Sequence, residues 1–252
     1  MDSFLLEMIE KMQCFIGCSG FHNKDWKGDF YPAGLAQSKW FEYYCSRFNT
    51  LELNTTFYRF PRVEFLQRWY DKSPGDFVFS VKVPRLITHY KQFKDSARML
   101  NDFYTAVRAG LKEKLGAVLF QLPSRIVYNE DFLQRIIQTV DESFQNVIEF
   151  RHVSWWNERV WSELATHKII FCGISHPHLP QDILANTSTL YYRFHGLKKL
   201  YFSRYTKKDV EEFANVLKQK STLATAYIYF NNTATLAAVK NAIQLEKSLL
   251  KK

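Results

Sequence analysis

The chain has 252 residues, a net charge of +9 at pH 7 and a hydrophobic content of 46%, which is enough for a sizeable core. This length suits one large domain, and α/β barrels commonly have this size. No run reaches about 18 uninterrupted apolar residues, so we expect no transmembrane helix and no membrane partner. The positive charge permits anionic partners, nucleic acid included, but the lysines are scattered rather than gathered in a tract.

The N-terminal residues 1–13 are predicted to form a short amphipathic cap within a single domain that spans 1–252. Acidic side chains occur there, where a signal peptide would need a basic start and an unbroken apolar run. The cysteines lie mostly in apolar patterns and lack a second pair with metal-site spacing, which predicts buried free thiols. The four are Cys14, Cys18, Cys45 and Cys172. These features predict a cytoplasmic protein.

Eight short apolar runs are predicted to form strands, at 14–18, 50–54, 77–82, 116–121, 147–151, 169–174, 190–195 and 226–231. Helical spacing and capping residues predict helices between them, at 38–48, 62–70, 96–111, 131–140, 207–218 and 233–250. The segment 175–188 contains two prolines and is predicted to be a loop with at most one helical turn. Strands that alternate with helices in this way predict a single parallel (β/α)8 TIM-like barrel.

Two of the predicted helices begin with clear capping signals. Asn129 precedes two acidic residues, a pattern that satisfies free backbone N–H groups and suits the helix dipole. Thr206 and Asp209 have the spacing of a capping box.

Polar side chains gather where the predicted strands end. Four strands end in a polar pair at a spacing of two: Glu52 with Asn54, Ser80 with Lys82, Glu149 with Arg151, and Arg193 with His195. Residues two apart on a strand share a face, and the C-terminal ends of barrel strands carry the active site in TIM-barrel enzymes. We therefore expect one polar cluster at one mouth of the barrel. The alternative is a set of ion pairs that only fills the top layer of the barrel; we favour a ligand site because so many buried polar groups need partners.

The residue types suggest acid/base chemistry on an anion. Glu52 and Glu149 are candidate general acids or bases, and His195 is a candidate proton relay. Lys82, Arg151 and Arg193 would form an electropositive floor for a phosphate or carboxylate. The predicted catalytic residues are thus Glu52, Glu149, Lys82 and His195.

The remaining candidates would bind and orient the substrate. The amides of Asn54, Gln121 and Asn231 end three strands, and His89 follows another. The candidate wall of the site is aromatic and comprises Trp26, Tyr31, Phe57, Tyr58, Trp155 and Trp156. The alternative for each aromatic residue is packing beneath the loops.

We predict no cofactor. Glu, His and Asn at strand ends, together with His176 and His178, are compatible with a divalent metal as the alternative. However, the sequence has no HExxH helix, Cys/His quartet or cluster of aspartates, and the nearby cations oppose metal binding. It also has no glycine-rich phosphate loop, GxSxG elbow or dinucleotide fingerprint.

Seven motifs occur in register along most of the chain: IGCSGFHNKDWKGDFYP, TLELNTTFYRFP, FVFSVKVPRLITH, LGAVLFQLP, IEFRHVSWW, YYRFHG and YFNNTATLAAVKNA. In this order they resemble the domain of unknown function 72, or YecE-like, family. The resemblance implies a TIM barrel and no particular reaction. The sixth strand departs from the family pattern, because Gly173-Ile174-Ser175-His176 stands where an aspartate-containing segment is expected.

Taken together, these features predict a cytoplasmic enzyme that acts on a small phosphate- or carboxylate-bearing substrate as a hydrolase, lyase or isomerase. One alternative is a nucleic-acid-binding protein or barrel-type phosphodiesterase, which would use the basic charge and exposed aromatic side chains. Another is a non-catalytic binding module, because fold alone does not determine function. The sequence makes no prediction of oligomeric state.

Overall fold

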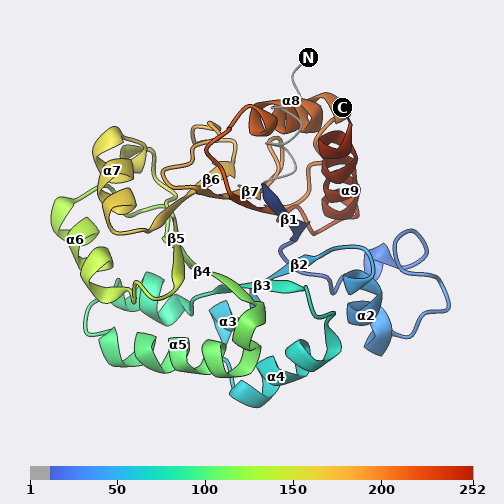
Figure 1. The fold of residues 1–252 in the computed structure, drawn as a ribbon, viewed down its shortest axis with the longest axis horizontal. Coiled ribbons are helices and arrows are strands. Elements are labelled where there is room, and N and C mark those ends of the chain that lie inside the picture. The colour runs from blue at the N-terminus through green and yellow to red at the C-terminus, as the bar shows by residue number, and fades with distance from the viewer. Residues whose placement is uncertain (1–11, 252) are drawn as a thin grey trace.

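The computed structural model describes residues 12–251. Eight parallel strands close into a barrel in chain order, and helices surround it (Figure 1). The strands are β1 Gln13–Cys18, β2 Thr50–Leu53, β3 Val78–Lys82, β4 Leu115–Gln121, β5 Gln145–Glu149, β6 Ile170–Ser175, β7 Thr189–Phe194 and β8 Thr225–Phe230. The ring is closed by β1 and β8, which pair along six residues each. The predicted (β/α)8 barrel is confirmed.

Helices occupy the six predicted ranges, and further helices lie outside them. They are α2 Trp40–Cys45, α3 Thr55–Tyr58, α4 Val63–Lys72, α5 Ala97–Leu111, α6 Glu130–Thr139, α7 Glu158–Thr166, α8 Lys207–Lys218 and α9 Ala237–Leu250. Short 3-10 turns lie at Lys24–Trp26, Gln37–Lys39, Lys112–Lys114 and Val153–Trp155, and a π-helical turn lies at Leu86–Lys91. The helix α7, the short α3 and the π-helical turn were not predicted. A single turn such as α3 leaves little periodicity in the sequence, and for α7 the N-cap Asn157 was the signal that was missed.

Both capping predictions are confirmed. The Asn129 side chain accepts a hydrogen bond from the Phe132 backbone N–H at 2.9 Å, and Thr206 with Asp209 forms the reciprocal capping box of α8. The segment between β6 and β7 is an irregular loop, as predicted. Of the predicted N-terminal cap, residues 1–11 lie outside the described residues, and Gln13 already belongs to β1. Within residues 12–251, no helix has the length and apolar character needed to cross a membrane.

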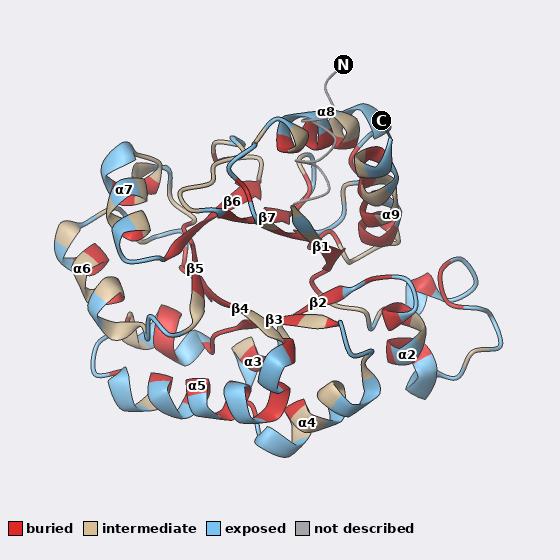
Figure 2. Cartoon of the chain, in the orientation of Figure 1, coloured by how far each residue is buried: buried red, intermediate tan, exposed pale blue. Residues whose placement is uncertain are grey.

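The buried side chains form two layers (Figure 2). The larger layer fills the space between the outer face of the strands and the helices, whose inner faces are buried and outer faces exposed. The smaller layer lies inside the barrel and includes Phe15, Leu119, Val147 and Tyr227. Because strand residues alternate between two faces, every second residue of each strand points into the barrel.

The inward-facing residues change from apolar to polar along the strands. On β5, Val147 is followed by Glu149, and on β7 Tyr191 is followed by Arg193. All four are buried. The barrel interior is therefore apolar toward the N-terminal ends of the strands and charged toward the C-terminal ends.

Candidate functional site

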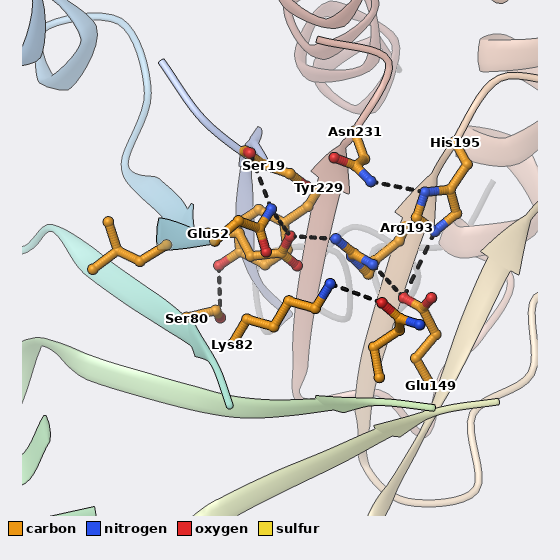
Figure 3. Close-up of polar contacts among 12 residues, drawn as sticks. Ser19, Glu52, Ser80, Lys82, Glu149, Arg193, His195, Tyr229 and Asn231 are labelled. Carbon is orange, nitrogen blue, oxygen red and sulfur yellow. Dashed lines mark hydrogen bonds and ion pairs between the residues drawn. The ribbon is translucent and has the colours of Figure 1, made fainter. Parts of the chain in front are cut away.

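Arg193 on β7 lies at the centre of a buried charge network (Figure 3). One of its terminal nitrogens donates to Glu52 Oε1 on β2 at 2.7 Å, and the other donates to Glu149 Oε2 on β5. The side chains of Arg193 and of both glutamates are at most 1% exposed. One guanidinium thus joins strands on different sides of the barrel and balances two carboxylates that would be unstable if buried alone.

The network continues from Glu149 toward the mouth. Arg151 pairs with the second oxygen of Glu149 and donates to His195 Nε2 at 3.1 Å. Its side chain is 10% exposed, so it lies at the edge of the network rather than within it. Burial alone would raise the pKa of Glu149, but Arg151 and Arg193 outweigh burial and hold that pKa well below its usual range. Glu149 is therefore an ionised hydrogen-bond acceptor at neutral pH.

His195 is an uncharged link in this network. Burial, followed by the charge of Arg151, lowers its pKa well below the usual value of a histidine. Because an arginine can only donate, Nε2 accepts and the ring proton lies on Nδ1. The Asn231 amide lies 2.9 Å from Nδ1, and its carbonyl oxygen must face the ring, since the two ends of an amide exchange by a 180° rotation.

Lys82 at the end of β3 is placed differently from the arginines. Its Nζ donates to Gln121 Oε1 at 2.8 Å and lies 3.9 Å from the centre of the Phe57 ring. No carboxylate of the described chain forms an ion pair with it, because Glu52 and Glu149 are bound to arginines. Burial, followed by the charge of Arg193, lowers the pKa of Lys82 to about 7.

A cavity of about 350 Å³ opens at the β1–β2 side of the mouth. Its lining includes Ser19, Glu52, Asn54, Trp26 and Tyr201. Within residues 12–251, the Ser19 hydroxyl and the Asn54 carbonyl oxygen are buried without a hydrogen-bond partner. Unsatisfied buried polar atoms that line a cavity are what a polar ligand would satisfy.

Another cavity of about 560 Å³ lies at the opposite end of the barrel. Its lining is largely apolar and includes Met12, Cys14, Leu217 and Leu249, with Glu246 among them. It lies by the N-terminal ends of the strands, the end that supports stability rather than catalysis in TIM barrels. The charge network lies at the other end.

The structure brings together most of the residues that the sequence singled out. Glu52, Glu149, Arg151, Arg193, His195 and Asn231 form the network, Lys82 and Gln121 lie beside it, and Asn54 donates to Glu52 Oε1 at 3.1 Å. His89 contacts the edge of the Phe57 ring, with 5.1 Å between ring centres. Burial, followed by the charge of Lys82, lowers the pKa of His89 to about 4.

The predicted aromatic wall is only partly present. Tyr31 is fully buried, stacks on Trp40 and donates to the Phe21 carbonyl, so it packs beneath the first loop. Trp155 packs in the same way and donates to the Ile126 carbonyl. Tyr31 and Trp155 therefore pack beneath the loops and do not line the site. Trp26 lines the cavity but is anchored by a bond to the Thr235 carbonyl, and Tyr58 is 70% exposed outside the network.

Two buried tyrosines inside the barrel were not singled out in the sequence. Tyr191 donates to Glu52 Oε2 at 2.7 Å, and the Tyr229 hydroxyl is 2.6 Å from Thr50 Oγ1 and 2.9 Å from Ser80 Oγ. Tyr191 stands two residues before Arg193, and Tyr229 two residues before Asn231. Extending the spacing-of-two rule backwards along each strand would have found both.

Among residues 12–251, no group of three or more His, Cys, Asp and Glu side chains is arranged to hold a metal ion. His176 and His178 lie near each other, with 5.8 Å between ring centres. Burial, followed by the charge of Arg151, lowers the pKa of His176 to about 4.

The chain is similar in sequence to bacterial proteins that carry the designation UPF0759. Over 112 residues it is 30% identical to the UPF0759 protein YecE of Escherichia coli, and this region covers 44% of the chain and 41% of YecE. It is 22% identical over 264 residues to the UPF0759 protein YunF of Bacillus subtilis, with 92% of this chain and 93% of YunF covered.

Solved structures agree with the barrel. A crystal structure of a DUF72 family protein from Thermotoga maritima matches this chain with a TM-score of 0.86 and 26% identity. The match covers 95% of this chain and 100% of the Thermotoga maritima chain. A crystal structure of a DUF72 family protein from Enterococcus faecalis has a TM-score of 0.82 at 19% identity, and the match covers 95% of this chain and 96% of the Enterococcus faecalis chain. At this identity the match shows a similar fold alone. The family model described as "Protein of unknown function DUF72" matches residues 15–252. The chain therefore belongs to the DUF72 family.

Proposed function

We propose that this protein is an enzyme that acts on a small anionic substrate at the C-terminal mouth of its barrel. The observation that carries the proposal is the distribution of charge at this mouth. Glu52 and Glu149 are both bound to arginines, whereas Lys82 has no carboxylate partner among the described residues. When Lys82 is protonated, the network holds three cations against two anions, and a substrate anion would balance them.

The residues take distinct roles in this proposal. Arg193 positions the two glutamates, because its terminal nitrogens are bound to them and it is 1% exposed. Arg151 and Lys82 lie nearer the mouth and contact the anion, and the amides of Gln121 and Asn231 orient it. Arg151, Gln121 and Asn231 are half-buried and Lys82 is 8% exposed, whereas Glu52, Glu149 and His195 are fully buried.

Acid/base chemistry without a redox cofactor is the reaction class that this site supports. Proton transfer is most effective when the pKa of the catalytic group lies near the working pH. Lys82, with a pKa of about 7, meets this condition. Glu149, with its low pKa, is suited to stabilising a positive charge, so the protein is a candidate lyase, isomerase or hydrolase in which Lys82 exchanges the proton.

A thermal-shift screen tests the proposal. The probes are inorganic phosphate, simple carboxylates and sugar phosphates, each at low and high salt, because a ligand of the native state raises the melting temperature by mass action. We expect a small anion to stabilise the protein at both salts, and Arg151→Met to lose most of the shift. The control is Arg159→Met, which removes an exposed arginine paired with Glu130 on the outer helices and should keep the shift. If both variants respond to every probe as the wild type does, the proposal is wrong.

A second candidate function, nucleic-acid binding, rests on a different surface. A groove of about 1010 Å³ runs along α3 and the start of α4, lined by Tyr58, Phe60, Arg59, Arg62 and Arg68. Exposed aromatic rings between arginines suit stacked bases and a phosphate backbone. Binding of a single-stranded oligonucleotide should then fall steeply with salt and fall further in Arg59→Ala/Arg62→Ala. Binding that is insensitive to salt would contradict this candidate.

A cytoplasmic location fits these proposals. All four cysteines are free, as predicted, and three of them are buried. Free thiols are typical of a reducing compartment.

A further inference from the structure

We propose that Lys82 is a nucleophilic amine that forms an imine with the carbonyl group of a small aldehyde or ketone acid. The inference rests on the proposed function, because it uses the same mouth and the same anion contacts. It goes beyond that function by naming the substrate class and a covalent step.

The hydrogen bonding of Lys82 carries the inference. Its Nζ has one hydrogen-bond acceptor in the described chain, the neutral Gln121 amide, and the Phe57 ring covers another side. Lys114, a lysine of similar burial, shows the contrast: its Nζ donates to the carbonyls of Tyr70 and Ser73 and to the Ser73 hydroxyl at 2.8–2.9 Å. A protonated amine has three N–H donors, so the three oxygen acceptors around Lys114 Nζ match an ammonium in number, whereas Lys82 Nζ has one such acceptor in the described chain.

The charged groups around Lys82 come from every side of the barrel. They are Glu52 on β2, His89 after β3, Glu149 and Arg151 at the end of β5, and Arg193 on β7. Both carboxylates are bound to arginines, and His89 is neutral at pH 7 because its pKa is lowered to about 4. A desolvated lysine beside other cations loses its proton easily, and a free amine is the nucleophilic form.

Lys82 is also reachable from the mouth. It is 8% exposed, whereas Glu52 and His195, which face the same space, are fully buried. Gln121, which accepts from Lys82 Nζ, is half-buried. A small carbonyl compound that reaches Lys82 from the mouth would have its acidic group near Arg151, whose charge acts on Lys82 and whose side chain is 10% exposed.

Imine formation needs only the Lys82 amine and the carbonyl compound. The Nζ lone pair attacks the carbonyl carbon and the C=O π bond breaks, which gives a carbinolamine. The C–O bond then breaks, and the oxygen leaves as water with both amine hydrogens, so that an N=C bond remains. No oxidant or reductant is needed. A proton from the solvent then gives the cationic imine, which Glu149 can stabilise by charge.

Reductive trapping tests the inference. The intact protein at pH 7 is treated with glyoxylate or with formaldehyde in the presence of cyanoborohydride, which delivers hydride to an imine carbon and makes the link permanent. Peptide mapping by mass spectrometry then measures the rate of labelling at each lysine. We expect Lys82 to be labelled at least about tenfold faster than Lys208, which is 83% exposed, because burial lowers the pKa of Lys82 to about 7 and leaves much of it as the free amine at this pH.

Variants separate recognition from reactivity. Lys82→Arg keeps the positive charge and should lose the fast labelling, whereas Arg151→Met should lose the preference for glyoxylate and keep the reaction with formaldehyde. Labelling of Lys82 no faster than that of Lys208 with both probes would overturn the inference. If an anion still stabilises the protein in that case, the proposed function stands without the imine; if none does, both fail.

Discussion

Arg193 is the residue on which the charge network depends, because its one guanidinium serves two carboxylates from different strands. Removal of one partner from a buried ion pair leaves an uncompensated charge, which is far more destabilising than loss of a surface pair. The sequence predicted that these charges meet at one mouth of the barrel. It did not predict which guanidinium meets which carboxylate, because that depends on the tilt and register of strands far apart in the chain.

We predict that Arg193→Met lowers the free energy of unfolding by about 3–5 kcal/mol, because Glu52 and Glu149 lose their shared partner. Urea denaturation at pH 7 measures the change. Arg159→Met serves as the matched control, since its pair with Glu130 is exposed to solvent and should contribute far less to stability. Equal losses in the two variants would mean that the buried network does not stabilise the barrel.

Lys82 should make stability depend on pH. Its pKa is about 7 in the folded protein and about 10.4 in an unfolded chain, so the unfolded state binds more protons between these values. The contribution of Lys82 to the free energy of unfolding therefore rises with pH across this window, by at most about 1.4 kcal/mol per unit. Below about pH 7 both states are protonated and the contribution is constant.

The comparison of wild type with Lys82→Met isolates this effect. Urea denaturation at several pH values from about 7 to 9 should show the wild type gaining stability relative to the variant as pH rises. A stability difference that does not change with pH over this range would show that Lys82 titrates as an ordinary lysine.

At the scale of the elements, alternation along the strands carried most of the prediction. The polar pairs at the ends of β2, β3, β5 and β7 were predicted because a spacing of two fixes a common face. The positions of the loop side chains were harder to predict. Tyr31 and Trp26 follow the same strand and carry similar aromatic rings, yet of the two only Trp26 lines the cavity. Their positions depend on tertiary packing that has no period in the sequence.

The contact between β1 and β2 depends on a glycine. The Tyr44 hydroxyl fits between the strands, where it accepts from the Cys18 N–H at 2.8 Å and donates to the Thr50 carbonyl at 3.0 Å. A Cβ atom on Gly17 would lie 2.3 Å from the Thr50 carbonyl oxygen and 2.8 Å from the Tyr44 hydroxyl. A side chain at this position would push the strands apart.

Gly17→Ala should therefore destabilise the protein by about 1–3 kcal/mol, as overpacking does in other cores. Gly34→Ala is the control, because a Cβ atom at that exposed position would meet nothing within 4 Å and its change should stay within about 0.5 kcal/mol. Urea denaturation of both variants checks the difference. A Gly17→Ala variant as stable as Gly34→Ala would show that β1 and β2 can move apart without a loss of stability.

At the scale of the whole molecule, the barrel was predictable because eight strands and their helices alternate along the chain. The position of the charged end followed from the topology, since parallel strands all point their C-terminal ends to one mouth. The net charge of +9 was less informative. It did not predict that Arg59, Arg62 and Arg68 line a groove outside the barrel, because that grouping arises only when α3 and α4 fold.

Lys82 lies at the mouth without a carboxylate partner among residues 12–251, and its pKa is lowered to about 7. An NMR titration of the protein with ¹³C-labelled lysine measures this directly, with Lys82→Arg used to assign the Lys82 side-chain signal. The account predicts a midpoint of about 7 for Lys82. A midpoint of about 10.4, the value of an unperturbed lysine, would contradict this prediction and leave Lys82 as an ordinary cation.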